Sequence, residues 1–188
     1  MRILESDKLL IKPTEESDLN ELMQLRWDAD VMSNLLHEPI GMKQQMEWFK
    51  NISAKDIVMT IFLKSEENLN IIGTTGLYNI NMRHQTATLK IRISPTAQGK
   101  GIGPKLFIMI LDYAFGTLNL RKICSDNFSE NEGVAKLKGK LGFVKEGTLR
   151  KHYYHNGEFR DADIYNLLKE DYYKSEKVQE VRNTIKYS

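Results

Sequence analysis

The sequence has one cysteine, no long apolar run and almost no net charge, and each of these shortages excludes a class of protein. A single thiol, Cys124, excludes an internal disulfide and any multi-thiolate metal site. Without a run of about 18 apolar residues or the apolar core of a signal peptide, we expect no membrane span and a cytoplasmic location. The 27 basic residues nearly balance the 25 acidic ones and form no long run, which argues against a nucleic-acid partner.

The remaining composition is typical of one globular domain. Hydrophobic residues make up 41% and charged residues 28% of the 188 residues, which is enough to bury one core. No internal repeat or linker divides the chain. We therefore expect a single domain over residues 1–172, followed by a helical or loose tail at residues 173–188.

Apolar periodicity predicts the element order β-α-α-β-β-β-α-β-α-β-β. This order is that of an α/β (α+β) fold, a mixed and mostly antiparallel sheet with helices on both faces. The dipeptide Asn156-Gly157 between two strand-like segments is a strong hairpin signal. Strands are expected at residues 4–13, 57–63, 71–80, 87–93, 122–125, 143–155 and 159–168, and helices from about residues 19 and 42 and at residues 105–115 and 130–140.

A turn with three glycines, Gly99, Gly101 and Gly103, separates the strand that ends near Ile93 from the next helix. Pro104 suits the first turn of that helix, where its missing N–H has no partner to lose. Such a turn exposes backbone N–H groups beside the positive end of a helix dipole, as a pyrophosphate site requires. Its spacing fits neither a Walker loop nor a dinucleotide fingerprint. From the glycines alone, a flexible surface turn is an equally good interpretation.

Two blocks of the sequence resemble the GCN5-related N-acetyltransferase (GNAT) superfamily. Gln98-x-x-Gly101-x-Gly103 is similar to the family's Q/R-x-x-G-x-G/A loop, which holds the pyrophosphate of acetyl-CoA. The segment from Asn131 to Phe143 is similar to the family's N-x-x-A/S-x-x-x-Y-x-K-x-G-F block. Residues 143–161 look like the C-terminal hairpin of one branch of this superfamily, which contains ribosomal-protein N-terminal, spermidine and certain amino-sugar acetyltransferases.

The resemblance implies a sheet of about seven strands, in which two central parallel strands splay apart around acetyl-CoA. A backbone N–H of the strand at residues 91–93 would polarise the thioester carbonyl. The amine would then attack the thioester directly in a ternary complex, without a metal. The residues implied in holding acetyl-CoA are Ile91, Arg92, Ile93, Gln98, Gly99, Lys100, Gly101, Ile102, Gly103, Pro104, Asn131 and Lys138.

The chain departs from the family at two positions where relatives often place a base and an acid. Thr88 stands where relatives have a glutamate base, and Lys138 stands where they have a tyrosine acid, so both are catalytic candidates by position only. Because threonine is no base at neutral pH, the amine proton must leave through water, His84, His37 or Glu38. Lys138 is interpreted either as a group that stabilises the leaving thiolate or binds a phosphate, or as a solvated helix lysine.

In this branch the acceptor is recognised near the first two helices and the C-terminal hairpin, so Glu38, His37, His84 and Tyr153 are candidate substrate residues. Glu38 is equally well interpreted as an exposed loop acid. The leading hypothesis is acetylation of a small-molecule amine, a polyamine or an amino sugar. The alternatives are a protein N-terminal or lysine acetyltransferase and a non-catalytic acyl-CoA sensor, the latter motivated by Thr88 and Lys138. The sequence is compatible with a homodimer.

Overall fold

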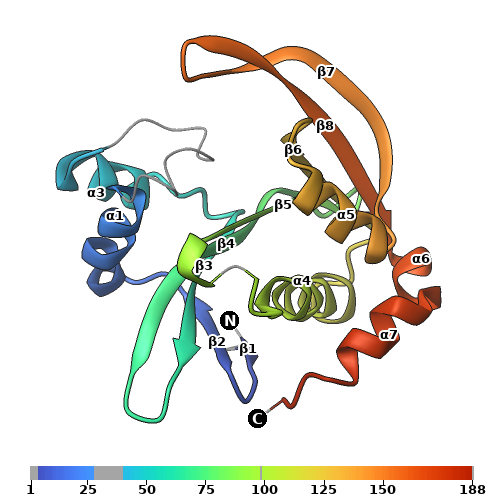
Figure 1. Cartoon of the computed structure of the whole chain (residues 1–188), viewed down its shortest axis with the longest axis horizontal. Coiled ribbons are helices and arrows are strands. Elements are labelled where there is room, and N and C mark those ends of the chain that lie inside the picture. Colours follow the sequence, from blue (N-terminus) through green and yellow to red (C-terminus); the bar gives the residue numbers. More distant parts are fainter. Residues whose placement is uncertain (1–3, 28–39, 98, 188) are drawn as a thin grey trace.

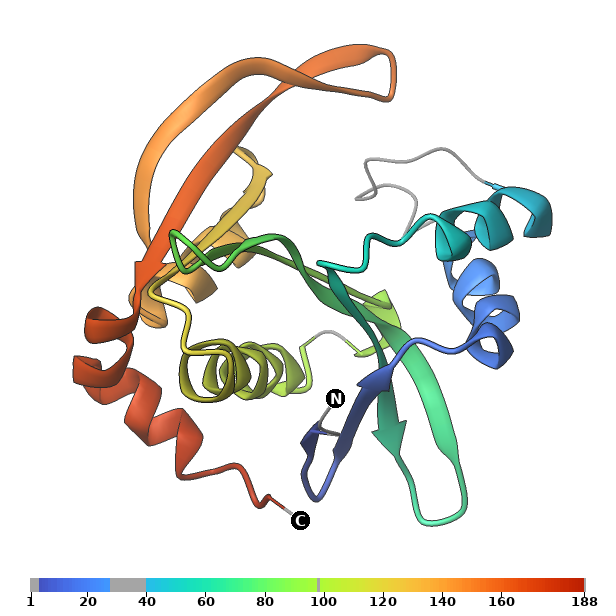
Figure 2. The same cartoon turned by 180° about the vertical axis from the view of Figure 1, so that it is seen from behind.

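The computed structural model describes residues 4–27, 40–97 and 99–187, which form one curved sheet with helices on both sides (Figures 1 and 2). In these ranges the sheet has eight strands in the order β1-β2-β3-β4-β5-β6-β8-β7. All neighbours are antiparallel except β5 and β6, which run parallel. The strands are β1 (Leu4–Glu5), β2 (Leu9–Pro13), β3 (Ile57–Lys64), β4 (Leu69–Asn81), β5 (Thr86–Ile93), β6 (Lys122–Phe128), β7 (Val144–His155) and β8 (Glu158–Leu168).

The helices lie on opposite sides of the sheet. Figure 2 shows α4 inside the curve of the sheet and α1 and α3 on the other side of β4. Within the described ranges, no helix is both long enough and apolar enough to cross a membrane. The helices are α1 (Leu19–Trp27), α3 (Met42–Lys50), α4 (Ile102–Asp112), α5 (Glu132–Lys140), α6 (Lys169–Lys174) and α7 (Glu176–Arg182), and a π-helical turn (Tyr113–Thr117) extends α4.

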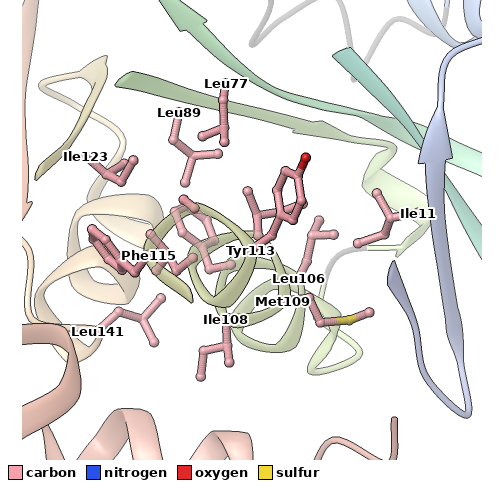
Figure 3. Close-up of a cluster of buried hydrophobic side chains, with 14 of the residues drawn as sticks. Ile11, Leu77, Leu89, Leu106, Ile108, Met109, Tyr113, Phe115, Ile123 and Leu141 are labelled. Carbon is pink, nitrogen blue, oxygen red and sulfur yellow. The ribbon is translucent and has the colours of Figure 1, made fainter. Parts of the chain in front are cut away.

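Helix α4 is the centre of the hydrophobic core because it is apolar on nearly every side. Leu106, Ile108, Ile110 and Leu111 are all 0% exposed. Figure 3 shows α4 side chains surrounded by apolar residues from β2, β4, β5 and β6. Each such side chain contributes about 1.5–3 kcal/mol on burial, so the position of α4 is strongly fixed. Its N-terminus is thereby held just beyond the end of β5.

Strands β7 and β8 form a long hairpin that extends beyond the rest of the sheet (Figure 1). Asn156 and Gly157 have φ values of 50° and 86°, which is the left-handed pair that a tight hairpin turn requires. Register shifts between Lys145 and Gly147 and between Leu149 and Tyr153 bend β7. The hairpin predicted from the sequence is therefore confirmed, including its turn.

The predicted element order is also confirmed, with differences at the ends of elements. The first predicted strand is in fact a small hairpin, β1 and β2, because the Ser6 hydroxyl accepts a hydrogen bond from the N–H of Leu9 at 3.1 Å and turns the chain. Strand β6 runs to Phe128, beyond the expected end at residue 125. At the C-terminus, Val178 and Ile185 join the main core.

Candidate active site

The parallel strands β5 and β6 separate after three paired positions. Pairing runs from Thr86–Lys122 to Thr88–Cys124 and then stops, although β5 continues to Ile93 and β6 to Phe128. The opening is a cleft of about 560 Å³, lined by residues 89–93 of β5, residues 125–128 of β6, the glycine turn and one side of α5. The splayed central strands implied by the family resemblance are therefore present.

The glycine turn forms one end of the cleft. Gly99 and Gly101 have φ values of +73° and +71°, a left-handed conformation that other residues rarely adopt, and Gly101 is the N-cap of α4. A Cβ at either position would meet no described atom within 4 Å, so both glycines face open space. Among residues 99–103, no backbone N–H donates to a described carbonyl outside α4. These N–H groups, next to a helix N-terminus, form a surface that can bind an anion.

Helix α5 forms the opposite wall of the cleft and begins at Asn131. The Oδ1 atom of Asn131 caps the helix by accepting a hydrogen bond from the N–H of Val134 at 3.1 Å. Asn131 also lines the cleft, where its amide nitrogen can donate to a ligand carbonyl. A single residue thus sets the start of α5 and presents a polar group to the cleft.

Lys138 lies in the last turn of α5 and is only 1% exposed. Its Nζ donates to Oδ1 of Asn127 at 2.8 Å and lies 4.9 Å from the centroid of the Tyr165 ring. Burial lowers the pKa of Lys138 from 10.5 to about 8, an effect that the charges of Asp126 and Asp163 partly oppose. Because the side chain is buried in the cleft wall, the interpretation of Lys138 as a solvated helix lysine is wrong.

Asp126 of β6 also lines the cleft, and sequence reasoning missed it. Its Oδ2 accepts a hydrogen bond from the Tyr153 hydroxyl at 2.7 Å, and the Tyr153 ring packs edge-on against Phe128 with centroids 5.9 Å apart. Burial, together with the hydrogen bond to Asp126, raises the pKa of Tyr153 well above its usual range. No motif contains Asp126. The only available signal was a carboxylate between Ser125 and Asn127 in a strand that leads into the cleft.

The structure brings most of the sequence-predicted cofactor residues to one cleft. Those that line it are Ile91, Arg92, Ile93, Gly99, Gly101, Gly103, Pro104, Asn131 and Lys138. Lys100 is exposed on the turn, and the side chain of Ile102 is buried in the core. Gln98 lies outside the described residues.

The predicted catalytic and substrate residues are more scattered. Thr88 is at the last paired position of β5, directly before the strands separate, and its side chain does not line the cleft. His84 is exposed in the turn before β5, at the closed end of the strand pair, so the structure does not bring it to the cleft. Tyr153 reaches the cleft only through Asp126. His37 and Glu38 lie outside the described residues.

Comparison with protein families identifies this arrangement. A family model described as an acetyltransferase (GNAT) domain matches residues 8–144. The chain belongs to the GNAT acetyltransferase family. It is accordingly an N-acetyltransferase that uses acetyl-CoA, as the resemblance of the two sequence blocks implied. Within the described ranges, no group of three or more His, Cys, Asp or Glu side chains is placed to hold a metal ion.

Several spermidine acetyltransferases are similar to this chain. A spermidine N(1)-acetyltransferase of Vibrio cholerae is 31% identical over 167 residues, which cover 89% of this chain and 96% of the relative. The spermidine N(1)-acetyltransferase of Escherichia coli K12 is 32% identical over 152 residues, 81% of each chain. A crystal structure of spermidine N-acetyltransferase from Vibrio cholerae in complex with CoA and spermine has a TM-score of 0.79 and 30% identity, covering 88% of this chain and 98% of that chain.

Proposed function

We propose that this GNAT enzyme transfers the acetyl group of acetyl-CoA to a primary amine of a polyamine, by direct attack in a ternary complex. The observation that carries the proposal is the cleft between β5 and β6, which ends at a glycine turn whose N–H groups donate to no described carbonyl outside α4. The spermidine acetyltransferases named above, which are similar over most of their length, support the polyamine as acceptor. A cytoplasmic location belongs to the same proposal, and a homodimer stays a prediction.

The residues of the cleft fit a coenzyme A thioester. The N–H groups of residues 99–103 and the N-terminus of α4 would hold the pyrophosphate, and Gln98 belongs to the same turn. From Leu89 to Ile91, β5 is paired with β4 along one edge but not with β6 along the other, and the backbone groups of that second edge would align the pantetheine arm. Asn131 would contact that arm from α5. Acetyl-CoA supplies the activated acetyl group, so the protein needs no nucleophile of its own.

The acceptor must be positioned at the same cleft and lose its proton. An alkylamine has a pKa near ~10 and therefore arrives mostly as an ammonium ion at neutral pH. Asp126 is the described carboxylate that lines the cleft and can attract such a cation. Arg92 lines it as well, so the walls carry both signs of charge. For this reason the identity of the acceptor needs a direct test with differently charged amines.

Release of free thiol from acetyl-CoA in the presence of different amines tests the proposal. The panel comprises spermidine, spermine, amino sugars and short peptides with free N-termini or lysines. We expect turnover with the polyamines. Turnover confined to peptides would replace the proposal by a protein acetyltransferase, and tight acetyl-CoA binding without turnover on any amine would indicate a sensor.

A separate experiment tests where the cofactor binds. Gly101→Glu places a carboxylate where the pyrophosphate is expected, so we expect CoA affinity by calorimetry to fall at least about a hundredfold, because like charges repel at short range. Gly157→Glu is a matched control, since Gly157 has a φ of +86° and open space like Gly101 but lies in the hairpin turn. Equal CoA affinity in both variants would refute the placement of the pyrophosphate.

A further inference from the structure

Lys138 is an unusual residue for the interior of a protein. A lysine is almost never fully buried without a charged partner, because taking an ammonium ion out of water is costly. Yet only 1% of Lys138 is exposed, and the contacts of its Nζ are the neutral amide oxygen of Asn127 and the face of the Tyr165 ring. The two other lysines of α5, Lys136 and Lys140, are exposed. The packing of α5 therefore does not explain why a buried position of this helix carries an amine.

The carboxylates nearest to Lys138 act on it from a distance and have other partners. Asp163 of β8 accepts hydrogen bonds from Ser129 and Thr148, both at 2.7 Å, and pairs with Lys145 at 2.7 Å. Although burial alone raises the pKa of Asp163, these contacts hold it below its usual value, so the group is ionised. Asp126 is tied to Tyr153. Lys138 consequently keeps a proton that is attracted by two anions but bonded to neither.

Strand alternation places Asp126 and Asn127 on opposite faces of β6, and both line the cleft. Asn127 faces α5 and holds the amine of Lys138, while Asp126 faces the hairpin and receives the hydroxyl of Tyr153. One wall of the cleft thus carries a proton donor on one side and a proton acceptor on the other. This is the arrangement that acetyl transfer requires, because one proton must reach sulfur while others leave nitrogen.

We propose that Lys138 donates a proton to the sulfur of the departing coenzyme A, and that Asp126 accepts a proton from the incoming amine. Asn127 positions Lys138, and Tyr153 positions Asp126. The inference rests on acetyl transfer from acetyl-CoA in this cleft and does not depend on which amine is the acceptor. It also explains how the chain works with Thr88 at the position where relatives often have a glutamate.

The protons and bonds balance as follows. The acceptor enters as R–NH₃⁺, and Asp126 takes one proton from it and passes that proton to water. The nitrogen forms a bond to the acetyl carbon, the carbon–sulfur bond breaks, and Lys138 Nζ gives its proton to sulfur. The neutral amine of Lys138 then removes the second proton from nitrogen, which leaves the amide. One proton is released to solvent in each turnover, and Lys138 and Asp126 return to their starting states.

The first test measures the pKa of the thiol of bound coenzyme A and does not depend on turnover. The ultraviolet absorbance of the thiolate is followed against pH in the CoA complexes of the wild type, Lys138→Met, Lys138→Arg and the control Lys136→Met. A nearby cation lowers the pKa of an acidic group by about 1–3 units, so we expect the thiol to titrate lower in the wild type than in Lys138→Met. Lys136→Met should match the wild type. An identical midpoint in the wild type and Lys138→Met would overturn the proposal.

Lys138→Arg separates proton donation from charge. Arginine remains protonated throughout the accessible pH range, so it keeps the positive charge but does not give up a proton. We expect Lys138→Arg to retain a lowered thiol midpoint while kcat falls about 10²–10⁴-fold, the usual size of general acid catalysis. Wild-type kcat in Lys138→Arg would leave only an electrostatic role and overturn proton donation.

Asp126→Asn tests whether Asp126 accepts a proton from the incoming amine. We expect kcat to fall by about 10²–10⁴-fold at neutral pH and to recover as the pH approaches the pKa of the amine, where no proton need be removed before attack. An unchanged kcat at neutral pH would refute the role of Asp126. These assays use whichever amine the wild type acetylates. If no amine in the panel is acetylated, the proposed function fails, while the thiol titration still decides the role of Lys138.

Discussion

Two partly or fully buried cations of this enzyme, Arg182 and Lys138, are held in opposite ways. Arg182 of α7 contacts Asp112 of α4 through two nitrogens, with Nε 3.3 Å from Oδ2, and lies 5.2 Å from the centroid of the Tyr172 ring. Asp112 also accepts hydrogen bonds from the hydroxyls of Tyr172 at 2.8 Å and Tyr187 at 2.9 Å. Although burial alone lowers the pKa of Arg182, these contacts raise it above its ordinary value.

Lys138 has no such partner. In the part of the chain that the structure describes, no carboxylate oxygen lies within 4.0 Å of its Nζ, and burial lowers its pKa to about 8. The difference separates two uses of a buried charge. A cation bonded to a carboxylate fixes the geometry of its surroundings, here the docking of α7 on α4. A cation held by an amide and a ring releases its proton more easily, which suits a catalytic acid.

Breaking the Arg182 arrangement should have the largest effect on stability. Asp112→Ala leaves a largely buried guanidinium and two tyrosine hydroxyls without their acceptor. The pair is 22% and 27% exposed, so we expect about 2–3 kcal/mol of destabilisation, somewhat less than for a fully buried pair. Urea unfolding measures it, and kcat at 25 °C should not change, because Asp112 does not line the cleft.

A matched control for this variant is Glu180→Gln on the same helix as Arg182. Glu180 pairs with Lys177, but the two side chains are 62% and 55% exposed, so removing the pair should change the unfolding free energy by less than about 0.5 kcal/mol. If Asp112→Ala destabilises the protein no more than Glu180→Gln does, the contacts between Arg182 and Asp112 do not stabilise the fold, and the contrast between Arg182 and Lys138 is wrong.

Replacing Lys138 should change the unfolding free energy in the opposite direction. Lys138→Met fills the same volume without a charge to desolvate, so we expect stability at pH 7 to rise by about 1–3 kcal/mol. The exposed Lys136→Met should change it by less than about 0.5 kcal/mol. A clear loss of stability in Lys138→Met, measured by urea unfolding, would show that the lysine is needed for packing.

The gain in Lys138→Met should depend on pH in a direction fixed by the pKa. The pKa of Lys138 is about 8 in the folded chain and 10.5 when unperturbed, so between these values the unfolded wild type binds more protons. The wild type therefore gains stability as the pH rises from about 8 to 10.5, by up to about 3 kcal/mol. The advantage of Lys138→Met should shrink across this window. An advantage that is constant with pH would contradict a lowered pKa.

The fold could be predicted from the sequence wherever local chemistry decides the structure. Asn156-Gly157 specified the hairpin, and the glycine turn before an all-round apolar segment located both the cleft end and α4. Each of these signals is contained in a short stretch of consecutive residues. The splitting of the first strand at Ser6 was missed, because a single hydroxyl that accepts from the N–H of Leu9 overrides an apolar alternation typical of one strand.

The charged part of the site could not be predicted in the same way. Asp126 and Tyr153 lie on β6 and β7, which are brought near each other by the pairing of β8 with both strands. Lys138 lies on α5 and reaches β6 and β8 through its contacts with Asn127 and Tyr165. The position of Lys138 was recognised by resemblance to a motif. Its burial was not, since that depends on contacts with Asn127 of β6 and Tyr165 of β8, which belong to other elements than α5.

The smallest expected effect concerns Tyr153, which holds the carboxylate that Lys138 does not contact. Tyr153→Phe keeps the ring against Phe128 and removes only the 2.7 Å hydrogen bond to Asp126. We expect a loss of about 1 kcal/mol in the unfolding free energy. Because Asp126 without this hydrogen bond samples more orientations and spends less time in the one that accepts the amine proton, kcat should fall several-fold at neutral pH and recover at high pH. Tyr154→Phe, whose side chain is on the exposed face of the hairpin, should match the wild type in both measurements. If Tyr153→Phe also matches it, Tyr153 does not position Asp126, and the proton acceptor side of the cleft must be reassigned.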